Sequence, residues 1–191
     1  MIGRPAPTEY APFYAGYVSD VPEDDIVRVL QTQPLELRSH AASVPTEREC
    51  FRYGAGKWSV RELFGHLGDA ERVFGYRAFC ISRGETASLP GFDEKQYIAR
   101  AAYDNVPLAD LVEQLIAVRE TNLMCLRRLE ESTWTAQGLA NGTPVTVRAL
   151  AFIMAGHVRH HLRILTTRYG LSAVAAPVST PSVGRGAPAD V

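Results

Sequence analysis

The sequence has no excess of one charge and no long apolar run, and each shortage excludes a class of protein. Its 20 Lys and Arg residues nearly balance its 21 Asp and Glu residues, so the net charge is −1. The basic surface that binding to a phosphate backbone normally requires is therefore missing. The apolar runs are far shorter than the roughly 20 residues of a membrane span, and the N-terminus lacks the pattern of a secretion signal. We expect neither a nucleic-acid partner nor a membrane partner.

Cysteine is also scarce, because the chain has only Cys50, Cys80 and Cys125. They are odd in number, widely spaced and without a Cys-x-x-Cys pair, so we expect no disulfide framework and no thiolate zinc site. Cys80 and Cys125 are more typical of core thiols than of nucleophiles. This usage favours a reducing compartment, and we expect a cytoplasmic protein.

What is present is the composition of an ordinary globular domain, with 46% hydrophobic and 21% charged residues in a chain of 191. Residues 1–19 mix tyrosine and phenylalanine with prolines, which predicts an extended aromatic arm lying on the domain. Residues 172–191 contain no Leu, Ile or aromatic residue, which predicts a disordered tail. The folded domain should therefore occupy residues 20–171.

Within that domain the apolar residues recur at spacings of three and four, with no long alternating pattern, so we predict an all-α protein. Ser59 and Glu62 form a capping-box pattern and Thr146 is a second helix cap. Residues 141–144 are a turn cluster. Short connections between long helices predict a four-helix bundle. The long helices are expected over about 22–43, kinked or split at Pro34, and over about 60–83, 107–131 and 147–169, with a short helix over about 94–102.

The histidines are the feature that calls for a chemical explanation, because three of the five lie within residues 157–161. His157 and His161 are one helical turn apart, about 6 Å, on the inward face of the last helix. His66 lies on the inner edge of an earlier helix, where a bundle can place it opposite the pair. Three neutral imidazoles could hold one divalent ion, zinc or nickel, with a coordination position left for water or substrate. The alternative is that each histidine satisfies itself with a buried hydrogen bond.

Other polar residues are weaker candidates. Asp69, one turn beyond His66, is a candidate catalytic residue that would orient an imidazole or act as a general base, and the alternative is an exposed helix carboxylate. His160 should flank the site or face solvent, and Glu71 is expected to be a surface charge. Trp58 and Trp134 are expected to anchor the core. A stripe of three arginines predicts a solvated or subunit-contacting surface: Arg148, Arg159 and Arg163.

Two stretches carry a resemblance to a known family. Residues 56–71, GKWSVRELFGHLGDAE, and residues 155–162, AGHVRHHL, together with the helix order, resemble the DinB superfamily of four-helix bundles, which includes bacillithiol-transferase-like proteins. The similarity extends from about residue 20 to residue 170. It implies an up-down-down-up topology with a long crossover, a metal ion held by His66, His157 and His161, and a homodimer.

The resemblance also implies a reaction, in which the metal binds a low-molecular-weight thiol, such as bacillithiol or mycothiol, for transfer to a small electrophile. Two alternative functions use the same three-histidine metal site. One is a hydrolase in which the ion activates water to attack an amide or ester. The other is a non-catalytic or stress-associated bundle whose ion only ties two helices together. A ferritin-like di-iron site is disfavoured, because no glutamate stands three residues before His66, His157 or His161.

Overall fold

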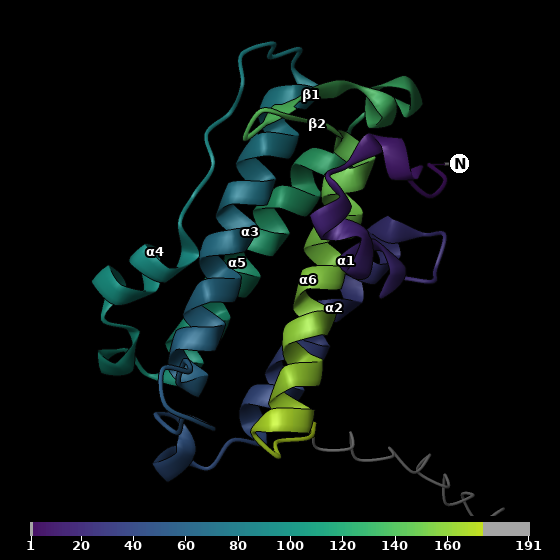
Figure 1. The fold of residues 1–191 in the computed structure, drawn as a ribbon. Coiled ribbons are helices and arrows are strands. Elements are labelled where there is room, and N and C mark those ends of the chain that lie inside the picture. The colour runs from purple at the N-terminus through teal and green to yellow at the C-terminus, as the bar shows by residue number, and fades with distance from the viewer. Residues whose placement is uncertain (1, 174–191) are drawn as a thin grey trace, which may run out of the picture.

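The computed structural model describes residues 2–173, and four long helices form its main body (Figure 1). Helices α2 and α3 both contact α5 and α6, so the order around the bundle is α2, α5, α3, α6. The predicted four-helix bundle is confirmed. The long helices are α2 (Ile26–Ala42), α3 (Val60–Ser82), α5 (Leu108–Leu126) and α6 (Val147–Arg168).

The direction of the helices gives the bundle its topology. Helices α3 and α5 run the same way and are joined by a long crossover, residues 83–107, that carries the short helix α4 (Glu94–Ala101). Helices α2 and α6 run the opposite way. This is the up-down-down-up arrangement expected from the resemblance, and it brings α3 and α6, which are remote in sequence, side by side.

Helix starts follow the predicted caps. The Glu62 amide donates to the Ser59 hydroxyl at 3.0 Å, and the Ser59 amide donates to the Glu62 carboxylate at 2.8 Å. The Ala149 amide donates to the Thr146 hydroxyl at 3.2 Å. Each cap contributes about 1 kcal/mol to helix stability. Pro34 lies inside α2 without splitting it into two helices.

A two-stranded hairpin joins α5 to α6, which the sequence did not predict. Strand β1 (Gln137–Ala140) pairs antiparallel with β2 (Thr143–Thr146) after a single 3-10 turn, η5 (Glu131–Thr135). Asn141 and Gly142 form its loop with φ values of 51° and 71°, the left-handed conformation that Asn-Gly hairpins require. The strands are too short for alternation to be visible, and α5 ends at Leu126 instead of near residue 131.

The N-terminal segment lies on α6, as the predicted arm should (Figure 1). It is more helical than expected, because it contains the 3-10 turns η1 (Pro7–Glu9) and η2 (Pro12–Tyr14) and the short helix α1 (Ala15–Ser19). Prolines still prevent one long helix. The part of the predicted tail from residue 174 onward lies outside the described residues.

The arginine stripe on α6 binds this N-terminal region, a contact that the prediction of a solvated or subunit-contacting surface did not include; Arg163 is exposed, as that prediction expects. Each guanidinium group forms an ion pair with a carboxylate that precedes α2 in the chain, which fixes the segment against the bundle. The pairs are Arg148–Glu9 at 2.5 Å, Arg159–Glu23 at 2.7 Å and Arg163–Asp20 at 2.9 Å.

None of the helices within residues 2–173 combines the length and the apolar character that crossing a bilayer would need.

Candidate metal centre

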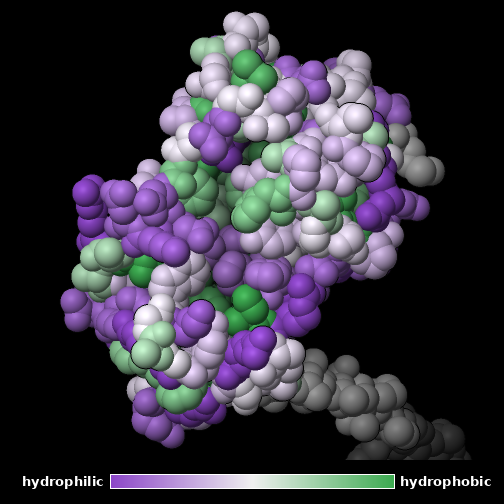
Figure 2. All heavy atoms as spheres, in the orientation of Figure 1, coloured by the Kyte–Doolittle hydropathy of each residue, from purple (hydrophilic) through white to green (hydrophobic). Residues whose placement is uncertain are grey.

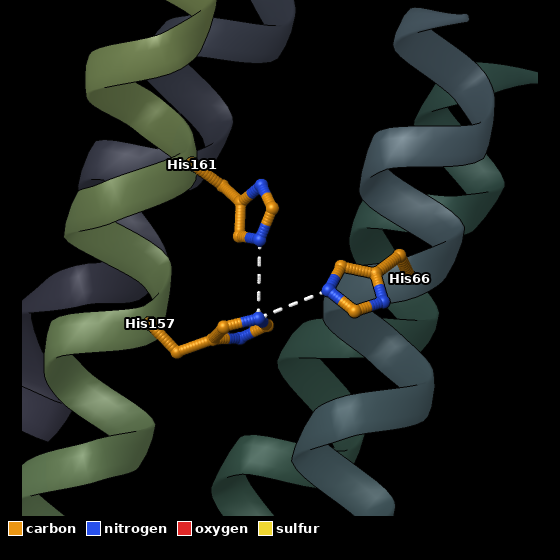
Figure 3. A group of neighbouring side chains, drawn as sticks. All are labelled: His66, His157 and His161. Atoms are coloured by element: carbon orange, nitrogen blue, oxygen red, sulfur yellow. Dashed lines mark hydrogen bonds between the residues drawn. The ribbon is translucent and has the colours of Figure 1, made fainter. Parts of the chain in front are cut away.

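His66 on α3 and His157 and His161 on α6 meet inside the bundle (Figure 3). The three residues are only 2%, 5% and 7% exposed. The Nε2 atom of His157 lies 3.0 Å from Nε2 of His66 and 3.1 Å from Nε2 of His161. One nitrogen from each ring lies within 4.8 Å of the others. The predicted convergence of three imidazoles from two helices is therefore present.

Aromatic rings cover this cluster on two sides. The Trp58 ring lies 4.7 Å from the His66 ring, and the Tyr17 ring of α1 lies 5.3 Å from the His157 ring. Gly156 allows the second contact, because a Cβ atom there would lie 1.9 Å from the Tyr17 carbonyl oxygen. The sequence placed Trp58 and Tyr17 only as core and arm residues. Their positions at the centre depend on packing between distant segments.

Burial fixes the protonation state of the cluster. It lowers the pKa of His66 to about 4, and it lowers the pKa values of His157 and His161 well below their ordinary value, with the neighbouring histidines adding to the effect. The rings are therefore neutral at pH 7, each with one N–H and one lone pair. Because His157 Nε2 can be a donor or an acceptor but not both, only one of its two contacts can be an ordinary hydrogen bond.

A divalent cation fits this arrangement. Two nitrogens that each lie about 2.1 Å from one ion are about 3.0 Å apart when the N–metal–N angle is 90° and about 3.4 Å apart when it is tetrahedral. The observed separations of 3.0 and 3.1 Å match the lower end of that range. Neutral imidazole suits zinc and nickel. Within residues 2–173 no cysteine or carboxylate joins the three histidines, so this donor set leaves coordination positions free.

Asp69 lies near this cluster in sequence, but its partners are elsewhere. Its side chain is 18% exposed, 4.0 Å from the Arg72 guanidinium, and its carboxylate accepts a hydrogen bond from Tyr103. Burial raises the pKa of Asp69. None of the three histidines is among its partners in the described structure, so a catalytic role stays a prediction. His160 flanks the centre as expected, with its ring 5.1 Å from the His161 ring and 5.2 Å from the Tyr17 ring.

Glu71 is not a surface charge, and this prediction is wrong. It is 2% exposed and forms two 2.8 Å hydrogen bonds with Arg119, which is fully buried. Arg119 also donates to Gln33 at 2.7 Å, and Gln33 donates to the Ala155 carbonyl at 2.8 Å. This Arg119 network joins all four long helices. A signal was available, since Glu71 continues the inward spacing that runs through Leu67 and Phe74.

Comparison with known proteins places the chain in a family. Residues 30–165 match the model of the DinB superfamily, which is well over half of the chain. The chain belongs to the DinB superfamily. A search of curated protein sequences finds no match for this DinB superfamily chain.

Two solved structures share the fold of this superfamily member. One is YfiT from Bacillus subtilis, described as "a probable metal-dependent hydrolase with an unusual four-helix bundle topology". Its TM-score is 0.70 at 19% identity, and the match covers 86% of this chain and 95% of YfiT. The other is a mycothiol-dependent maleylpyruvate isomerase, with a TM-score of 0.62 at 14% identity, over 86% of this chain and 66% of the isomerase. At such identities the likeness shows the fold alone.

Proposed function

We propose that this protein is a metal-dependent enzyme in which His66, His157 and His161 hold a divalent cation, zinc or nickel. One observation carries the proposal: the buried His157 Nε2 lies 3.0 and 3.1 Å from two other imidazole nitrogens. Neutral imidazoles cannot satisfy both contacts among themselves, whereas three lone pairs directed at one cation can. Membership of the DinB superfamily supports this assignment.

We infer that the reaction is the transfer of a low-molecular-weight thiol, such as bacillithiol or mycothiol, to a small electrophile. A divalent cation lowers the pKa of a coordinated thiol, so that a thiolate is available at neutral pH. The thiol would lose its proton to solvent, and its sulfur would displace a leaving group from an electrophilic carbon, so that a C–S bond replaces the bond to the leaving group, which departs with the bonding electron pair. The histidines hold the ion in place, while Trp58 and Tyr17 limit the access of water. The shared fold of the mycothiol-dependent isomerase supports a thiol co-substrate.

A metal-dependent hydrolase is the second candidate, and the likeness to YfiT favours it. The same three histidines would hold the ion, water would replace the thiol as the attacking group, and the substrate would be an ester or amide. The two candidates differ in one requirement, because only the first consumes a thiol.

The test begins with elemental analysis of protein purified without an affinity tag. We expect about one zinc or nickel ion per chain, and none in His157→Ala. His40→Ala is the matched control, because His40 lies on α2 with its Nδ1 atom 2.9 Å from the Glu36 carbonyl oxygen and outside the cluster. A wild-type protein that takes up no divalent metal would overturn the proposal.

The metal-loaded protein is then assayed with a panel of thiols and a small alkylating electrophile, and separately with esters and amides. Thiol-dependent consumption of the electrophile supports the transferase. Hydrolysis without thiol supports the second candidate instead. Loaded protein that turns over neither set would leave a non-catalytic metal-binding bundle. A homodimer and a cytoplasmic location remain proposals, the first testable by sedimentation velocity.

A further inference from the structure

A cavity of about 270 Å³ opens beside His161. Its walls come from the loop before α3, the start of α4 and the end of α6. Figure 2 shows the molecular face hollowed between the α4 side and the side of α6 and the N-terminal segment. Ligand sites are commonly about 300 Å³ or larger, so this one suits a small molecule or one end of it. The cavity is lined by Tyr53, Gly56, Lys57, Trp58, Leu63, Lys95, His161, Ile164 and Tyr169.

Both lysines of the whole chain line this cavity. The sequence contains only Lys57 and Lys95, and every other residue of its Lys and Arg total is arginine. The two come from different segments, the loop before α3 and the first turn of α4. No aspartate or glutamate is among the lining residues. The fold therefore gathers two cationic side chains from distant positions around a space without a carboxylate.

Neither ammonium group forms an ion pair within 4.0 Å in the described part of the protein, although the charge of Lys95 contributes to the lowered pKa of the neighbouring Asp93. Arginines on the same bundle pair with carboxylates, as Arg52 does with Glu62 at 2.9 Å, but residues 2–173 supply no ion pair to Lys57 or Lys95. The Lys57 ammonium instead lies 5.9 Å from the Tyr53 ring. Two unpaired cations at a concave, partly apolar surface create a positive potential that attracts an anion.

We propose that this lysine pocket binds an oxyanion group, a carboxylate or phosphonate, of a small substrate whose apolar part packs on Trp58 and Tyr169. The substrate class of the proposed function is then an anionic small molecule, with its charged end at Lys57 and Lys95 and its other end directed toward His161. Lysine binds such groups as a point charge. The assignment to substrate rests on the proposed metal-dependent function, whereas anion binding itself does not.

The scarcity of lysine makes the test site-specific. Reductive methylation with ¹³C-formaldehyde labels only Lys57, Lys95 and the α-amino group, and it keeps their positive charge. Phenylphosphonate is the probe and benzyl alcohol its neutral counterpart, and Lys57→Gln and Lys95→Gln assign the signals. We expect both lysine signals to shift saturably with phenylphosphonate and to stay in place with benzyl alcohol.

Affinity is measured on metal-free and on metal-loaded protein, because a phosphonate can also bind a metal ion. In the metal-free protein, Lys57→Gln/Lys95→Gln should weaken phenylphosphonate binding at least tenfold, whereas Arg28→Gln, which removes one charge from the exposed surface of α2, should leave it unchanged. Saturable shifts in a protein that takes up no metal would confirm the pocket and overturn only the proposed function. Normal metal uptake without lysine shifts, or equal loss in Arg28→Gln, would overturn the pocket alone.

Discussion

Two buried polar clusters lie in the same bundle, and they differ in how completely they satisfy themselves. In the Arg119 network every guanidinium nitrogen donates to an oxygen of Glu71, Gln33 or Leu30. In the histidine cluster His157 Nε2 faces two like nitrogens, and His161 Nδ1 has no hydrogen-bond partner in the described structure. The protein itself satisfies every guanidinium nitrogen of the first cluster, so we call that cluster complete. The second cluster is incomplete, because it keeps ring nitrogens that only a bound partner, such as the proposed metal ion, would satisfy.

This difference separates a structural role from a chemical one. A buried charge is tolerated only when its partners are in place, so the complete network holds its helices in one arrangement. Gln33 of that network bonds to Ala155, two residues before His157, and the charge of Arg119 contributes to the lowered pKa of His157. The complete cluster thus supports the part of α6 from which the incomplete cluster projects.

Breaking the complete cluster should give the largest effect. Arg119→Met leaves the Glu71 carboxylate buried without its cation, so we expect the free energy of unfolding to fall by about 3–5 kcal/mol. Urea denaturation followed by circular dichroism measures it. The double variant Arg119→Met/Glu71→Leu removes the stranded charge and should recover at least half of the loss. A double variant as unstable as the single one would mean that packing, and not charge pairing, is what Arg119 supplies.

The next effect concerns the incomplete cluster. Zinc at about 100 times its dissociation constant should raise the unfolding free energy of the wild type by about 2.7 kcal/mol, because the folded state alone binds it. His157→Ala should show no such gain, while His40→Ala should match the wild type. Calorimetric melting with and without zinc measures the difference. An equal gain in His157→Ala would place the ion elsewhere.

The sequence predicts those features of the two clusters that depend on residues close together in the chain or on the order of the helices. The caps at Ser59 and Thr146 are local, so the helix starts follow directly from the residues. His157 and His161 share a face because of helical spacing alone. His66 opposite them follows from periodicity and bundle topology, with the family resemblance adding support. In each case the signal lies within one helix or in the order of helices.

The rest could not be predicted because it depends on pairs of remote segments. The inward spacing of Glu71 is visible within α3, but the partner that makes its burial possible, Arg119 on α5, lies 48 residues away in the chain. The three stripe arginines of α6 pair with carboxylates more than a hundred positions earlier in the chain. The hairpin before α6 is a different case, because its strands are only four residues long and are too short for a pattern to appear.

The clusters also differ in the elements that cover them. A substitution at Gly156 tests whether α1 covers the histidine cluster. Helices enclose the Arg119 network, while α1 lies against α6 beside the histidines. Gly156→Ala should force α1 away from α6, because the new Cβ would lie 1.9 Å from the Tyr17 carbonyl. We expect about 1–3 kcal/mol of destabilisation and faster proteolysis within residues 2–25. Gly16→Ala is the matched control, since its Cβ meets nothing within 4 Å, and equal behaviour of the two variants would contradict the contact.

The smallest effect decides whether Asp69 is linked to the histidine cluster or only to Tyr103. If Asp69 orients a metal-binding imidazole, Asp69→Asn should weaken zinc affinity by about 10–100-fold. If it serves only Tyr103, zinc affinity should stay unchanged and the unfolding free energy should fall by about 0.5–1.5 kcal/mol, as it should in Tyr103→Phe. Competition with a chromophoric chelator measures affinity. The contacts of Asp69 within residues 2–173 are with Tyr103 and Arg72 and with no histidine, which favours the second outcome. A large loss of affinity confined to Asp69→Asn would restore its predicted role at the metal.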